Sequence, residues 1–137
     1  MDEPSERVVE QRIRNRVIEW LELASSFAEQ VEYDRALRAG RVYPNVAYEV
    51  INQFEDWVSN DPRAGGQLDV YPEAETLALG RVYAAWAVAA DALPKDYPSI
   101  ATAQALPEWG VLRSTAESAL KVFQIRGTLS EDNEVQE

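Results

Sequence analysis

Residues 5–38 read SERVVEQRIRNRVIEWLELASSFAEQVEYDRALR, a run that contains neither proline nor glycine. Ser5 follows Pro4 and is a candidate N-cap, because its hydroxyl can accept a hydrogen bond from the first helical turn. At 100° per residue, the apolar side chains of this run share one face and several acids fall opposite. The pattern predicts one long amphipathic helix whose apolar face carries Val9, Ile13, Val17, Trp20, Ala24, Phe27, Ala28 and Val31.

Three further helices are expected downstream. The first covers residues 45–58 and begins at the candidate N-cap Asn45; the second covers residues 72–93 and has Pro72 in its first turn. The last covers residues 107–124, and Gly127 is a credible stop for it. A short helical turn is expected over residues 99–104. Because alternating strand patterns are nearly absent, the chain is predicted to be all-α and most similar to a four-helix bundle with an overlong first helix.

Length and composition predict a single domain. With 137 residues, of which 46% are hydrophobic, the chain can bury one core. We expect residues 1–128 to form the helical domain. Residues 129–137 are polar and acidic, and we expect them to be a disordered tail.

The formal net charge is −11, and only four of those charges come from Glu131, Asp132, Glu134 and Glu137. A body of this sign repels phosphate backbones and attracts basic proteins, so no nucleic-acid partner is expected. The apolar run Leu77–Leu93 is interrupted by Arg81 and Asp91, which argues against a membrane span. With no cysteine and an acidic, apolar-poor start, the chain is expected to be cytoplasmic.

The sequence contains neither histidine nor cysteine. This removes the commonest general base, the commonest metal ligands, thiolate nucleophiles and the Ser-His-Asp route. We therefore expect no catalytic residues, no cofactor and no metal. A carboxylate-only magnesium or manganese site remains an alternative, with Glu49, Glu55 and Asp56, or Glu73 and Glu75, as its nearest candidates.

A candidate partner surface lies on the helix expected at residues 45–58. Tyr48 and Trp57 fall away from the centre of its apolar face, among the acids Glu49, Glu55 and Asp56. Exposed aromatic rings surrounded by acids are typical of a protein-binding surface, since aromatic anchors contribute much of the affinity of an interface. An equally open interpretation is that both rings only cover the loop after residue 58.

Two other functions are kept as alternatives. Arg81 and Asp91 are the only charges in the otherwise apolar run Leu77–Leu93, so they could orient a ligand in a pocket lined by Tyr83 or Trp86. Such a pocket would suit a small ligand-binding protein or a carboxylate-dependent enzyme. Spare apolar positions at Ile18, Leu23 and Val88 could instead support a homo-oligomeric structural protein.

The leading hypothesis is a non-enzymatic protein-interaction module that docks a basic protein partner. It rests on the net charge and on the chemistry that the composition excludes. In size, acidity and helicity the chain is similar to immunity proteins of bacterial toxin systems, and that resemblance implies binding and blocking of a toxic domain. The resemblance is one of general class and no motif carries it.

Overall fold

The computed structural model describes residues 3–40, 45–64, 70–96 and 98–135. Within these residues the chain forms helices and no strand, which confirms the all-α prediction. The elements are α1 (Glu6–Ala24), α2 (Phe27–Ala39), α3 (Val46–Trp57), the 3₁₀ turn η1 (Pro62–Ala64), α4 (Glu73–Ala92), α5 (Ile100–Gln104) and α6 (Pro107–Gln124). None of the helices in this part of the chain has both the length and the apolarity needed to cross a bilayer.

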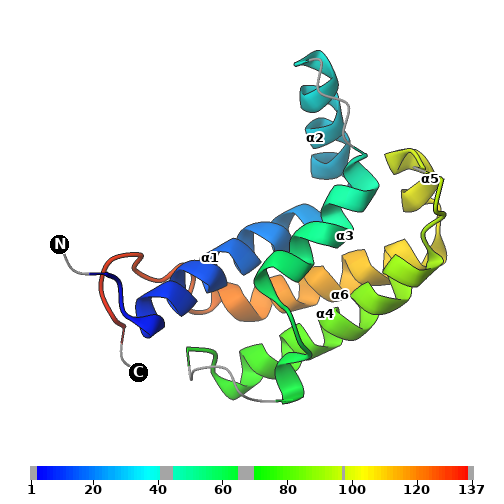
Figure 1. The fold of residues 1–137 in the computed structure, drawn as a ribbon. Coiled ribbons are helices and arrows are strands. Elements are labelled where there is room, and N and C mark those ends of the chain that lie inside the picture. The colour runs from blue at the N-terminus through cyan, green and yellow to red at the C-terminus, as the bar shows by residue number, and fades with distance from the viewer. Residues whose placement is uncertain (1–2, 41–44, 65–69, 97, 136–137) are drawn as a thin grey trace.

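Four of the helices build the body of the fold. Helix α6 lies between α1 and α4, and α3 crosses over α1 (Figure 1). The short helix α5 sits at the end of the body where α4 leads into α6. Helix α2 projects away from the other helices, so the arrangement is bundle-like with one protruding arm.

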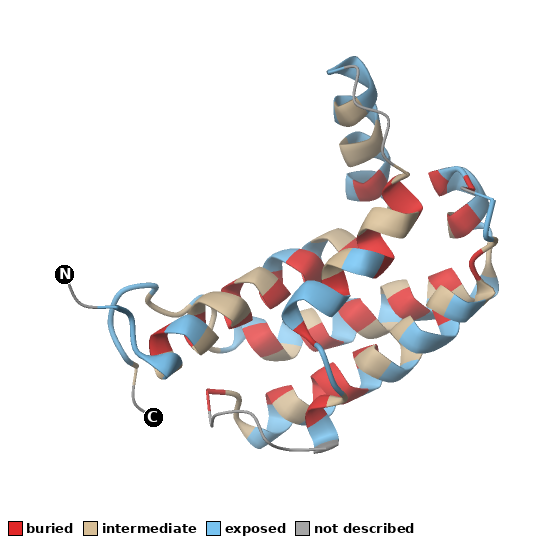
Figure 2. Ribbon diagram, in the orientation of Figure 1, coloured by how far each residue is buried: buried red, intermediate tan, exposed pale blue. Residues whose placement is uncertain are grey.

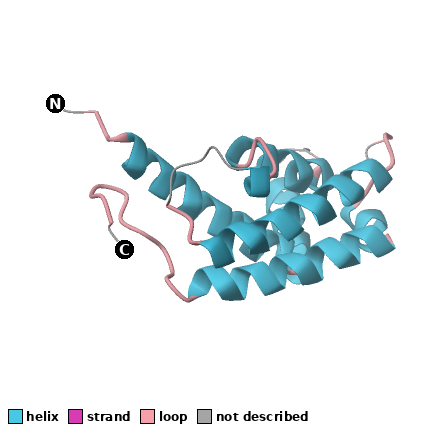
Figure 3. Ribbon diagram, turned by 90° about the horizontal axis from the view of Figure 1, so that it is seen from below, coloured by secondary structure: helices cyan, strands magenta, loops and turns pink. Residues whose placement is uncertain are grey.

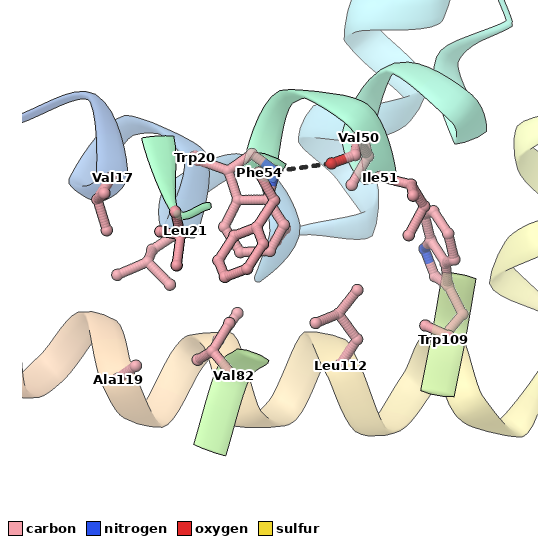
Figure 4. Close-up of a cluster of buried hydrophobic side chains, with 14 of the residues drawn as sticks. Val17, Trp20, Leu21, Val50, Ile51, Phe54, Val82, Trp109, Leu112 and Ala119 are labelled. Atoms are coloured by element: carbon pink, nitrogen blue, oxygen red, sulfur yellow. Dashed lines mark hydrogen bonds between the residues drawn. The ribbon is translucent and has the colours of Figure 1, made fainter. Parts of the chain in front are cut away.

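The core gathers side chains from all four body helices (Figure 4). The Trp20 indole contacts the Phe54 ring at a centroid separation of 4.6 Å, and its Nε1 donates to the Val50 carbonyl oxygen at 2.8 Å. Trp86 of α4 also packs against Phe54, with ring centroids 5.1 Å apart, and its Nε1 donates to the Ile51 carbonyl oxygen at 2.8 Å. Buried indoles are stabilised when their N–H finds an acceptor, and α3 supplies both of these.

The predicted helix over residues 5–38 is wrong in one respect, because it is two helices that separate at Ser25 and Ser26. Ser26 adopts an extended backbone conformation and its side chain accepts a hydrogen bond from the Glu29 amide, which begins α2. Adjacent serines compete for backbone partners and favour such breaks. After the break the expected apolar face does not continue: Ala28 and Val31 are exposed, and Gln30 is the one residue of α2 that is buried (Figure 2).

The C-terminal segment also differs from expectation. Residues 129–135 return along the N-terminal half of α1 (Figures 1 and 3), where they exchange hydrogen bonds with α1 side chains. The expectation of disorder is therefore corrected for these seven residues. The last two positions of the expected tail, 136 and 137, lie outside the described residues.

Candidate functional site

The predicted partner surface is divided between the two ends of α3. Tyr48 and Glu49 are half-buried near its start, where the Tyr48 hydroxyl donates to the Pro94 carbonyl oxygen at 2.5 Å. Asp56 and Trp57 lie at the other end of α3. Trp57 is nine residues after Tyr48, which corresponds to roughly 13 Å along the helix axis. The structure therefore does not join all five predicted residues into one patch.

The exposed end of α3 forms one wall of a cleft with a volume of about 410 Å³. Helix α1 supplies Glu10 and Ile13 to this cleft, and α4 supplies Leu79. The wall on the α3 side consists of Asp56, Trp57 and the segment that follows them. Of the five predicted surface residues, Asp56 and Trp57 line the cleft directly, while Glu55 is exposed beside them.

Three carboxylates line the cleft, but they differ in their partners. Asp61 already has a cationic partner, because the Arg63 guanidinium donates to both carboxylate oxygens at 3.1 and 2.9 Å. These hydrogen bonds lower the pKa of Asp61. Within the described residues, neither Glu10 nor Asp56 makes a hydrogen bond or an ion pair. Partial burial raises the pKa of Glu10, since desolvation disfavours its charge. The cleft thus contains two carboxylates that have no cationic partner among the described residues.

Tyr71 also lines this cleft. The ring meets the Phe123 ring edge-on at 6.1 Å between centroids, and its hydroxyl has no hydrogen-bond partner in the described part of the chain. Burial raises the pKa of Tyr71, and the charges of Glu10 and Glu75 add to that rise while Arg14 opposes it. The phenol therefore remains protonated at neutral pH and can donate a hydrogen bond.

The rim opposite α1 is positioned by a glycine in α4. A Cβ atom at Gly80 would lie 2.4 Å from Cδ of Arg63, so the absence of a side chain there lets Arg63 lie across α4. Arg63 in turn holds Asp61, and its own backbone amide donates to Asp61 Oδ1 at 3.0 Å. These contacts fix the segment after α3 at the edge of the cleft.

A buried ion pair lies close to the cleft. Arg14 Nε and Nη2 donate to the two carboxylate oxygens of Glu75, each at 2.8 Å, and Arg14 Nη1 donates to the Gly127 carbonyl oxygen at 2.6 Å. The side chains are 0% and 3% exposed respectively. The Arg14 guanidinium also lies over the Phe123 ring at 5.1 Å. This pair joins α1, α4 and the end of α6, and it is saturated by protein groups, so we assign it to folding.

Sequence reasoning did not identify Arg14 or Glu75, although a signal was present. Arg14 lies three, four and seven residues before Val17, Ile18 and Leu21, all of which are buried. That spacing places it on the buried face of α1. Glu75 offered no comparable signal, since an acid in the first turn of a helix is explained by the helix dipole alone.

The residues of the alternative pocket lie elsewhere. Arg81 and Asp91 are exposed on α4, whereas Tyr83 and Trp86 are half-buried against Phe54. None of these four residues lines the cleft described above. The geometry gives this ligand-pocket alternative no support.

The other two alternatives can be compared with the structure in the same way. Ile18 is 5% exposed and Leu23 packs on the core, so among the three candidate self-association positions only Val88 is largely exposed, at 58%. In the described ranges no three acidic side chains gather closely enough to hold a metal ion.

Comparisons with known proteins do not indicate a function, so the proposal below is based on the cleft. No protein-family model, no curated protein and no solved structure matches this chain.

Proposed function

We propose that the protein is a non-enzymatic interaction module that docks a basic protein partner, with a cationic side chain of the partner entering the cleft between α1 and the end of α3. The observation that carries this proposal is the pair of carboxylates, Glu10 and Asp56, that line the cleft with no cationic partner in the part of the chain that the structure describes. A lysine or arginine placed there would offset the desolvation of Glu10 and gain charge-assisted hydrogen bonds.

The surroundings of the two carboxylates suit a long basic side chain. Ile13 and Leu79 provide apolar surface for its methylene groups, and the Tyr71 ring lines the same space. Trp57 is 37% exposed at the rim, where an indole can stack on a guanidinium. The net charge of −11 would raise the rate at which a basic protein encounters this surface.

The entry of a cation can be tested directly with Nα-acetyl-arginine amide. We expect it to shift the NMR signals of the Trp57 indole N–H and of residues around Glu10, at millimolar concentration, whereas Nα-acetyl-glutamine amide should not. Two double variants distinguish an effect of the cleft from an effect of net charge. Glu55→Lys with Asp56→Lys should abolish the shifts. Glu22→Lys with Asp91→Lys changes the net charge by the same amount at distant exposed sites and should retain the shifts.

The same variants test the protein partner. Purified protein should capture a basic protein from lysate of its own cells in a stoichiometric and salt-sensitive way, and the Glu55→Lys, Asp56→Lys variant should lose it. Retention of every captured protein by that variant, with the variant folded, would rule the cleft out as the docking site. The narrower toxin-neutralising form of the proposal rests on size, charge and helicity, and it requires a toxin gene adjacent to the gene for this chain.

A further inference from the structure

The face of α1 that points away from the cleft is covered by the chain's own C-terminal segment, residues 129–135. The segment runs antiparallel to the helix, since Leu129 meets Asn15 and Val135 meets Gln11 and Arg7. Figure 3 shows this loop turning back from the end of α6 toward the start of α1. The contacts between this face of α1 and residues 129–135 indicate what kind of segment the face can bind.

Two side-chain amides bind the backbone of the segment. Asn15 donates from Nδ2 to the Leu129 carbonyl oxygen at 2.8 Å and accepts at Oδ1 from the Leu129 amide at 2.9 Å. Gln11 accepts from the Val135 amide at 2.8 Å and donates to the carbonyl oxygens of Ser130 and Asn133 at 2.9 and 2.8 Å. Gln11 is 0% exposed and Asn15 is 3% exposed, so both amides are enclosed and fully used.

Three arginines make further contacts with the segment, and Asn15, Arg16 and Arg12 contact its carboxylates. Arg7 Nε donates to the Val135 carbonyl oxygen at 3.0 Å, and Arg12 Nε donates to the Glu131 carbonyl oxygen at 2.7 Å. The Glu131 carboxylate accepts from Asn15 Nδ2 at 2.9 Å and pairs with Arg16. These contacts lower the pKa of Glu131, with the hydrogen bond from Asn15 as the largest cause.

The segment itself contributes little apolar packing. Residues 131–134 are exposed, and the segment is bent by a turn in which Ser130 Oγ accepts from the amides of Asp132 and Asn133 at 3.1 and 2.9 Å. Its attachment therefore depends on part-buried hydrogen bonds with Gln11 and Asn15 and on exposed charge pairs with Arg12 and Arg16, and salt screens the charge pairs. With little apolar packing to hold it, we expect the segment to detach more readily than the helical core unfolds.

We propose that this face of α1, formed by Arg7, Gln11, Arg12, Asn15 and Arg16, is a docking site for an acidic, non-helical segment of a partner protein that carries a central glutamate. The chain's own residues 129–135 fill the site in cis and must leave before the partner's segment enters. The argument is charge complementarity together with the backbone-binding amides, and it does not depend on the acidic cleft. Because the cis segment is tethered, its effective concentration is about millimolar, so a free peptide competes with it at a disadvantage.

The probe for this site is the synthetic peptide Leu-Ser-Glu-Asp-Asn-Glu-Val added to the full chain labelled with ¹⁵N. We expect the amide signals of Leu129 and Val135 to move to positions typical of free chain, while signals from α4 and α6 stay in place. Glu131→Gln in the full chain weakens the cis contact and should raise the peptide's affinity at least threefold. Glu134→Gln, which removes the same charge from a side chain with no hydrogen bond or ion pair in the described residues, is the matched control and should leave the affinity unchanged.

A peptide with glutamine at the position of Glu131 should bind more weakly to every chain. The proposal is overturned if millimolar peptide leaves the tail signals in place in folded Glu131→Gln protein. It is also overturned if sedimentation shows that this variant forms a concentration-dependent dimer, since a second copy would then be the occupant. Hydrogen exchange of the wild-type chain gives an independent measurement: exchange of the Leu129 and Val135 amides only through global unfolding would make the segment a permanent part of the fold.

Discussion

Arg14 shows how a single residue can hold three helices together. Its guanidinium makes hydrogen bonds to Glu75 of α4 and to backbone oxygens at the end of α6, including Phe123 at 3.4 Å. Removing two charges from water is costly, and this cost is offset only when the geometry is good and the remaining donors are satisfied. Here both conditions hold, and Arg126 Nη1 adds a second positive charge 3.9 Å from Glu75 Oε2.

Replacing Arg14 with methionine should therefore be strongly destabilising. Glu75 would remain buried with only the more distant Arg126 as a cation, and breaking a buried pair in this way costs about 3–5 kcal/mol of unfolding free energy. The double variant Arg14→Met, Glu75→Leu should recover most of that loss, because the buried carboxylate is removed with its partner and Arg126, which is 22% exposed, keeps its hydrogen bond to the Val70 carbonyl oxygen. Urea unfolding of the two single variants and the double variant measures the coupling. A loss below about 1 kcal/mol for Arg14→Met would contradict this account.

Tyr71 predicts a specific response to alkaline pH. Its pKa is raised in the folded state, so above its ordinary value near 10 the unfolded chain loses a proton that the folded chain keeps. Stability should then fall as pH rises above 10, by about 1.4 kcal/mol per pH unit for this one group. Tyr71→Phe should leave stability at pH 7 nearly unchanged, since the hydroxyl has no partner in the described residues, and should flatten the alkaline decline in urea unfolding. An equal decline in both proteins would assign it to other tyrosines.

At the scale of elements, the break between α1 and α2 explains why periodicity misled the sequence analysis. The apolar spacing continues through Ser25 and Ser26, so the sequence predicts one helix, yet the ends of α1 and α2 are both stabilised by specific polar contacts. Gln30 Nε2 donates to the Leu23 and Ala24 carbonyl oxygens at 3.1 and 3.2 Å, which satisfies acceptors at the end of α1. Its Oε1 accepts from Trp109 Nε1 at 3.0 Å. A partner 79 residues away cannot be inferred from local spacing.

Gln30→Leu should therefore disrupt the junction of α1, α2 and α6. The substitution preserves approximate size but removes the partner of the Trp109 indole N–H and a donor to the Ala24 carbonyl oxygen, whereas the Leu23 carbonyl oxygen still accepts from the Ser26 amide. Each unsatisfied buried group costs about 1–3 kcal/mol, so we expect a loss of more than about 2 kcal/mol in urea unfolding. Gln104→Leu removes one donor from the half-buried edge of the same cluster and is the milder control. Equal losses in the two variants would show that Gln30 has no special role.

Capped helices were predicted more accurately than junctions. The N-caps at Ser5 and Asn45 are confirmed, since their side chains accept hydrogen bonds from the Val8 and Tyr48 amides at 3.2 and 3.0 Å. The helix predicted at residues 107–124 has the observed bounds, because proline and the apolar spacing are local signals. Local physics therefore determined most of the helices from sequence alone.

At the scale of the whole molecule, the features that sequence could not supply are long-range polar contacts. The cleft joins Glu10 to Asp56, and the tail returns to α1 across more than a hundred positions. Gln11 and Asn15 look like ordinary surface residues in the sequence, yet they are buried and bind the returning segment. Asp56 and Trp57 were nevertheless selected from sequence, because aromatic and acidic side chains at the edge of an apolar helix face were recognisable without the cleft.

The same division between body and tail predicts opposite responses to salt. Raising NaCl from 0.1 to 1 M shortens the Debye length from about 10 Å to about 3 Å. Screening should weaken self-repulsion in a chain with a net charge of −11, so the thermal unfolding midpoint should rise. Screening should also weaken the pairing of Arg12 and Arg16 with Asp132 and Glu131, so the Leu129 and Val135 amides should exchange faster in the native protein. A general gain in stability would raise the midpoint and slow the exchange of the tail amides. A higher midpoint together with faster tail exchange would therefore show that the tail is attached separately from the body.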